Sequence, residues 1–192
     1  LLKIKSQNYR KIMTESSEIF AEVFGKSIYC KLINKEFLET DKPVLVFLHE
    51  GLGCSEQWKN FPEQMSTKLQ IPAFMYDRYG YGKSQKITEQ REVDYLEKEA
   101  SVFMPELFKK TGLDNYKKII FGHSDGGSIA IVYASLHPKD SLAIITEAAH
   151  VFIDEITEKG LQEAYSLYYN SDFREKLRKY HGGNTESMAE SW

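Results

Sequence analysis

The segment Gly122-His123-Ser124-Asp125-Gly126-Gly127 places a serine on a tight turn. It follows an apolar run that ends at Phe121 and precedes an apolar stretch of helical character. A serine between a strand and a helix presents its hydroxyl at the carboxyl edge of a sheet, where helix amides and the helix dipole favour an oxyanion. Gly122 and Gly126 are expected because a side chain at either position would collide with the turn. Glycine-rich loops also contain Gly-x-Ser-x-Gly by chance, so the flanking strand and helix carry the prediction.

A second glycine-containing loop, His49-Glu50-Gly51-Leu52-Gly53, follows the apolar run Pro43–Leu48. Its glycines allow the loop to fold over the same edge of the sheet, so that a backbone N–H faces the serine. We expect an oxyanion hole made by the N–H of Asp125 and that of Gly51 or Leu52. The alternative is a flexible turn between a strand and a helix.

The segment from Asp77 to Ser84 ends in Gly82-Lys83-Ser84, which resembles the end of a phosphate-binding loop. That loop needs a glycine five positions before Gly82, where this sequence has Asp77. The nucleotide interpretation is therefore rejected, and a structural turn beside the serine is predicted.

Alternating strand and helix patterns must position these loops. Residues 17–36 predict a β-hairpin with a turn at Gly25. Strands are predicted at residues 43–48, 71–76, 118–121 and 142–145, and helices at 58–69, 95–112 and 129–136. This order predicts an α/β fold, with a mostly parallel sheet flanked by helices and antiparallel strands at its start.

From Glu155 onward the pattern is helical only. One predicted helix carries Leu161, Tyr165 and Tyr168 on a stripe, and aromatic packing against the core is the favoured role of these tyrosines. A second helix is predicted to begin at a capping box, Asp172 with Glu175, and to end at Gly182-Gly183. We expect a core over residues 1–150 and a helical lid segment over 151–192.

Composition excludes several classes of protein. The chain has 192 residues, 42% of them hydrophobic, and a net charge of −3, which argues against a nucleic-acid partner. Its two cysteines form no metal or disulfide pattern, and no dinucleotide motif follows the first strand, so no cofactor or metal is expected. No apolar run approaches the roughly 20 residues that cross a bilayer, and the N-terminus has no secretory signal, which predicts a cytoplasmic protein without a membrane.

The chain resembles the α/β-hydrolase fold family. The hairpin, the His-Glu-Gly-Leu-Gly loop, the Asp-x-x-Gly-x-Gly-x-Ser turn and the Gly-x-Ser-x-Gly elbow occur in that family's order over residues 17–150. The loop and elbow spellings are similar to bacterial serine hydrolases of uncharacterised substrate, and residues from 151 resemble the start of a family lid. The resemblance implies Ser124 as the nucleophile, an acid after a later strand and a histidine after the last strand.

The sequence departs from the family after the lid helices, where no further strand, acidic turn or late histidine follows. A serine hydroxyl is a weak nucleophile without a base, so we expect base and acid from residues outside this sequence and an inactive 192-residue chain. Glu147, at the carboxyl end of strand 142–145, is a candidate acid because charged residues are seldom buried without a role. The alternative is a polar strand end.

None of the five histidines is an obvious base. His150 is expected at the edge of the site or in the hinge of the lid, and His49 is expected to brace its loop. We expect His123 to pack or cap, and His137 and His181 to be solvated.

Two functions follow. The first is a serine hydrolase that acts on a small-molecule ester, or on a thioester, amide or carbon–carbon bond, through an acyl-serine at Ser124. The second is a non-catalytic protein of hydrolase-like fold that binds a ligand or partner, in which an open sheet edge favours a homodimer.

Overall fold

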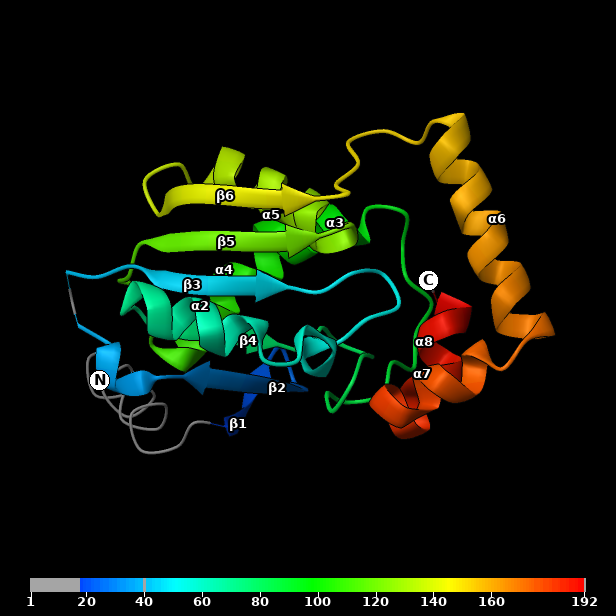
Figure 1. Cartoon of the computed structure of the whole chain (residues 1–192), viewed down its shortest axis with the longest axis horizontal. Helices are drawn as coiled ribbons and strands as arrows, with labels where there is room; N and C mark the ends of the chain where they lie inside the picture. Colours follow the sequence, from blue (N-terminus) through cyan, green and yellow to red (C-terminus); the bar gives the residue numbers. More distant parts are fainter. Residues whose placement is uncertain (1–17, 40, 192) are drawn as a thin grey trace.

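The computed structural model describes residues 18–39 and 41–191. They form a six-stranded sheet in the order β1-β2-β4-β3-β5-β6 (Figure 1). The strands are β1 (Glu18–Val23), β2 (Lys26–Ile33), β3 (Val44–Leu48), β4 (Ala73–Tyr76), β5 (Lys118–His123) and β6 (Ser141–Glu147). β1, β2 and β4 pair antiparallel in succession, whereas β4, β3, β5 and β6 are parallel neighbours. The predicted α/β sheet with antiparallel strands at its start is confirmed.

Helices cover both faces of this sheet (Figure 1). Those before the elbow are α2 (Phe61–Leu69), α3 (Tyr95–Lys98) and α4 (Met104–Thr111), and α5 (Asp125–Leu136) follows the elbow. Consecutive residues of β3 face opposite sides of the sheet. Val46 packs on the side of α4 and α5, and Phe47 packs on the side of α2, so both must be apolar. A strand buried on both faces is typical of a parallel sheet between helical layers.

The predicted helix over residues 95–112 is continuous but not uniform. A π-helical turn, η3 (Glu99–Phe103), lies between α3 and α4. Pro105, the second residue of α4, lacks the N–H that would bond to the preceding helical turn, and Gly112 ends the helix with φ 76°. The helix after the elbow begins at Asp125, four residues before the start at residue 129 that its apolar pattern predicts.

Three helices follow the sheet and lie at the carboxyl ends of β3 and β5 (Figure 1). They are α6 (Glu155–Asn170), α7 (Phe173–His181) and α8 (Thr185–Ser191). Tyr168, Leu177 and Met188 from these helices pack with Tyr81 of the turn after β4. The division into core and lid at residue 150 stays a prediction.

The predicted capping box at the start of α7 is wrong. Asp172 makes no side-chain hydrogen bond to the helix amides and instead pairs with Lys176 at 3.0 Å. The hydroxyl of Ser171 accepts the hydrogen bond from the Phe173 amide at 3.1 Å. The predicted end of this helix is confirmed, because Gly182 has φ 52°.

β6 is an edge strand among the described residues, and it pairs there with β5. Leu142 and Ile145 on it are 61% and 42% exposed. An apolar edge of this kind favours pairing with another chain. The homodimer stays a prediction, and light scattering over a range of concentrations tests it.

We predict that Gly126→Ala lowers the free energy of unfolding by about 3 kcal/mol or more. A Cβ at this position would lie 2.1 Å from the carbonyl oxygen of Leu48, so α5 would have to move away from β3. The matched control is Gly160→Ala in α6, where a Cβ meets nothing within 4 Å. The control should gain about 1 kcal/mol from helix propensity. Urea unfolding measures both, and equal midpoints for the two variants would show that the close approach is unimportant.

Candidate active site

Ser124 lies at a strained corner between β5 and α5. Its φ of 50° and ψ of −117° are unusual for a non-glycine residue. The neighbouring strand supports the corner, because the Ser124 amide donates to the carbonyl of Glu147 at 2.8 Å. A Cβ on Gly122 would lie 2.2 Å from the carbonyl oxygen of Gly126, so both glycines are needed for this turn. Ser124 also lines a cavity of about 840 Å³.

The amide of Asp125 lies beside Ser124 in the first turn of α5, where helix amides have no intrahelical acceptor. The loop after β3 is fixed by hydrogen bonds to one of its carbonyl groups. Its Glu50 carbonyl accepts from His49 Nδ1 at 2.8 Å, from Arg78 Nη2 at 2.8 Å and from the Gly53 amide at 3.2 Å. In a trans peptide the carbonyl and the next N–H point in opposite directions, so these bonds also fix the Gly51 amide.

His49 is a brace and not a base. Its buried ring donates from Nδ1 to its neighbour's carbonyl and accepts the Arg78 amide at Nε2, 3.1 Å away. Burial, assisted by the positive charge of Arg78, lowers the pKa of His49 well below its ordinary value. The ring is therefore neutral, as this pair of hydrogen bonds requires. The sequence-based expectation for His49 agrees with this geometry.

Arg78 connects the two loops. Its buried guanidinium donates to the carbonyl of Glu50 and pairs with the Asp125 carboxylate, with 3.4 Å between Nη1 and Oδ2. The hydroxyl of Tyr95 donates to the same carboxylate oxygen at 2.8 Å. Neither Arg78 nor Tyr95 was predicted from the sequence to be part of the site. The available signal was an arginine directly after Asp77 at a strand end.

The turn from Asp77 to Ser84 is structural, as predicted. The Asp77 carboxylate accepts from the amides of Ser55 at 2.7 Å and Lys83 at 2.8 Å. A Cβ on Gly82 would lie 2.1 Å from this carboxylate. A side chain of the protein thus occupies the amides that a phosphate would need.

His150 lies at the edge of the site, in agreement with one of its two expected roles. It lines the Ser124 cavity, and its Nε2 is 4.0 Å from Oδ1 of Asp125. Ser128 holds its backbone, since the serine hydroxyl donates to the His150 carbonyl at 2.5 Å. No hydrogen bond joins the Ser124 hydroxyl to a histidine within the described part of the chain.

The remaining histidines differ in part from expectation. His123 lies 3.6 Å from the carboxylate of Glu50 and is partly exposed. His137 was expected to be solvated but is half-buried, with its ring 4.7 Å from that of Tyr133. His181 was also expected to be solvated and is 2% exposed. The sequence around the end of α7 did not indicate that this end of the helix contacts the turn at Gly82.

His181 attaches the C-terminal helices to the site. Its Nδ1 accepts the Gly82 amide at 3.0 Å, so the proton is on Nε2, which donates to the carbonyl of Leu52 at 3.0 Å. Asn184 adds bonds to the carbonyls of Gly82 at 3.1 Å and Ser84 at 2.7 Å. Leu52, a candidate oxyanion donor, is thus held from the side of the C-terminal helices.

Glu147, the candidate acid, has an exposed side chain at the end of β6. The burial that suggested a role for it is absent, because β6 is an edge strand among the described residues. The tyrosines of α6 also differ in burial. Tyr168 is buried as predicted, whereas Tyr165 and Tyr169 are 68% and 55% exposed and lie with their rings 4.7 Å apart.

No group of three or more potential metal ligands occurs in residues 18–39 and 41–191. None of the helices described in the same ranges is long and apolar enough to cross a membrane.

Comparison with known proteins identifies the family. Residues 43–190 match the family model for the alpha/beta hydrolase fold. The chain therefore belongs to the alpha/beta hydrolase family, as the resemblance of its motifs indicated.

Individual relatives are distant. A proline iminopeptidase of Lactobacillus delbrueckii subsp. lactis is 28% identical over 118 residues, which are 61% of this chain and 38% of that protein. A carboxylesterase structure from Nitrososphaera gargenis superposes with a TM-score of 0.62 at 19% identity, covering 84% of this chain and 56% of the other. For a thermophilic esterase from Thermogutta terrifontis the TM-score is 0.61 at 16% identity, covering 92% and 73%. The chain thus spans less than half the length of this iminopeptidase. The relative and the two structural neighbours named above are hydrolases.

We predict that His181 contributes a loss of stability as the pH decreases below about 6.5. Burial lowers the pKa of His181, so the unfolded chain binds more protons than the folded chain in this range. His181→Gln keeps a donor and an acceptor but does not titrate. The loss of unfolding free energy between about pH 7.5 and pH 5.5 should therefore be smaller in this variant, with His49 still contributing.

The matched control is Asn184→Ala, which removes hydrogen bonds from the same contact without removing a titrating group. It should lower stability at every pH and keep the wild-type slope. Urea unfolding at several pH values measures this. A full pH dependence in His181→Gln would contradict the assignment.

Proposed function

We propose that the chain carries the nucleophile and oxyanion hole of a serine hydrolase. The observation that carries this proposal is the corner at Ser124, which has positive φ, lies at the start of α5 and lines a cavity. Membership of the alpha/beta hydrolase family and the hydrolases among its neighbours support it.

In the proposed reaction, Ser124 Oγ attacks the carbonyl carbon of the substrate while a base takes the hydroxyl proton. The resulting oxyanion accepts from the amide of Asp125 and from that of Gly51 or Leu52. Collapse of the tetrahedral intermediate transfers the proton to the leaving group and leaves an acyl-serine. Attack of water on this ester then releases the acid and regenerates the serine.

The base is proposed to come from outside the described residues, and the acid either from there or from Glu147. The hydroxyl of Ser124 makes no hydrogen bond to a described histidine. Glu147 remains a candidate acid, and its exposed carboxylate is accessible to a histidine from outside the described residues. We therefore expect the 192-residue chain alone to turn over slowly. Its residues 151–192 would act as a lid, since Leu161 of α6 lines the Ser124 cavity.

The cavity favours a substrate with an apolar group. Its walls include Leu96, Val132, Phe152 and Ile153. A small ester-like molecule fits this lining. The bond that is cleaved is an ester or an amide, since one relative is named an iminopeptidase and one structural neighbour is a carboxylesterase. The buried, unpaired cysteines Cys30 and Cys54 are consistent with a cytoplasmic location.

We predict that a fluorophosphonate probe labels Ser124, and that imidazole accelerates the labelling about tenfold or more by supplying a general base. Ser124→Ala should abolish labelling both with and without imidazole. Ser128→Ala is the matched control, because this serine lines the same cavity. Peptide mass mapping identifies the labelled residue. Labelling that persists in Ser124→Ala would remove this serine from the proposed chemistry.

A further inference from the structure

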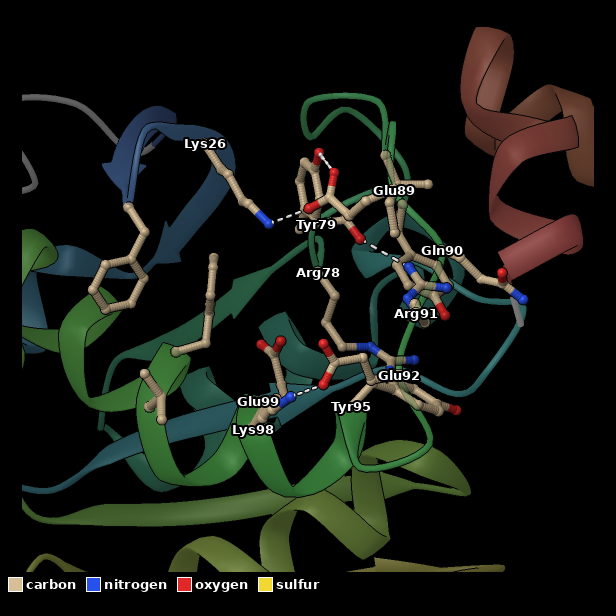
Figure 2. A pocket seen from close by; sticks show the side chains of 15 residues that line it. Lys26, Arg78, Tyr79, Glu89, Gln90, Arg91, Glu92, Tyr95, Lys98 and Glu99 are labelled. Atoms are coloured by element: carbon tan, nitrogen blue, oxygen red, sulfur yellow. Dashed lines mark hydrogen bonds and ion pairs between the residues drawn. The ribbon is translucent and has the colours of Figure 1, made fainter.

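A second cavity, of about 420 Å³, lies beside the active-site cavity and shares Tyr95 with it (Figure 2). Its walls come from the turn of the β1–β2 hairpin, the turn after β4, residues 87–92 and helices α3 and η3. The volume lies within the range of roughly 300–1,000 Å³ of small-molecule sites. Ser124 does not line this cavity, so the proposed hydrolysis gives it no role.

One end of the cavity carries the guanidinium groups of Arg78 and Arg91 (Figure 2). Arg91 Nη1 donates to the hydroxyl of Ser191 at 2.8 Å and Nη2 to the carbonyl of Tyr79 at 2.9 Å. Both acceptors are uncharged, and the described residues place no carboxylate within ion-pair distance of Arg91. A half-buried cation without a paired carboxylate is costly, which favours an anionic ligand.

Tyr81 lines the same end of the cavity and is 1% exposed. Its ring centroid is 4.5 Å from the guanidinium carbon of Arg78 and 4.4 Å from that of Arg91. Its buried hydroxyl has no hydrogen-bond partner in the described structure. An unsatisfied buried hydroxyl costs about 1–3 kcal/mol, so an acceptor brought by a ligand would be bound favourably.

Carboxylates around the cavity are engaged elsewhere. Glu99 Oε1 accepts from the hydroxyl of Tyr76 at 2.6 Å, and burial raises the pKa of Glu99, which weakens its repulsion of an anion. At the rim, Glu89 pairs with Lys26 at 2.6 Å, and Glu92 pairs with Lys98. Among the described cationic residues that line the cavity, Lys26, Arg78 and Lys98 thus have ion-pair partners, whereas Arg91 has none.

The other end of the cavity is apolar. Phe24 and Phe103 meet edge to face with ring centroids 6.2 Å apart, and Val102 lies on the same side. Phe24 and Val102 are 60% and 51% exposed, which is high for apolar side chains that line a cavity. Covering them with an apolar group of a ligand is favourable.

We propose that this cavity binds a small monocarboxylate with an apolar tail. The carboxylate accepts from Arg91 and from the Tyr81 hydroxyl, and the tail lies against Phe24, Val102 and Phe103. Arg78 and Tyr95 line the cavity and also contact Asp125, the residue after Ser124. The ligand would therefore be separated from Asp125 only by these two side chains.

The test is a calorimetric titration of the 192-residue protein with hexanoate, with hexanol and hexylamine as probes of the same tail. Saturable binding of hexanoate, and much weaker binding of the other two, is expected. Tyr81→Phe should weaken hexanoate binding about tenfold or more, because it removes a hydrogen bond to a charged group. The variant should fold, since the hydroxyl it loses has no partner in the described structure.

Arg91→Gln should also weaken hexanoate binding at least tenfold, and Arg91→Lys should retain part of the affinity because it keeps the charge. The matched control is Arg174→Gln on α7, where the arginine pairs with Glu186 at 2.8 Å away from the cavity lining. Thermal unfolding verifies that each variant is folded. Absence of hexanoate binding, equal binding of hexanol, or unchanged affinity in folded Tyr81→Phe would each overturn the proposal.

Discussion

The buried guanidinium of Arg78 is the constraint on which the site depends. A cation removed from water must find acceptors, and Arg78 finds them in two loops that are distant in sequence. It donates to the carbonyl of Glu50 and pairs with Asp125, so the loop after β3 and the elbow after β5 are fixed relative to one another. The orientation of the Gly51 amide follows from the same contact, because the carbonyl of its peptide is held.

Two further features reinforce this arrangement from either side. The glycines of the elbow allow α5 to begin close to the end of β3, since a Cβ on Gly126 would meet the Leu48 carbonyl. From the opposite direction, His181 holds Leu52 and Gly82 through a neutral ring. The core loops and the C-terminal helices therefore support one small region of backbone, in which amide hydrogens rather than charged side chains would stabilise an oxyanion.

The sequence predicted much of the fold because its signals are local. Apolar runs identified the strands, and the glycines around Ser124 predicted the turn, since each depends on neighbours in the chain. Long-range contacts were not predictable in this way. His181 at a helix end looked solvated, yet it packs against a turn 99 residues earlier. Arg78 gave no local signal of its partners, and Tyr81 gave none of its unpaired hydroxyl. The capping box at Asp172 failed because Ser171 caps the helix instead.

The central claim is that backbone amides from the two loops converge at Ser124. The most direct measurement is a crystal structure of the protein after phosphonylation of this serine. We expect the phosphonyl oxygen to accept from the amide of Asp125 and from that of Gly51 or Leu52, at about 2.7–3.1 Å. A phosphonyl oxygen that points into solvent, with both loops as described and neither amide within hydrogen-bond distance, would contradict the account.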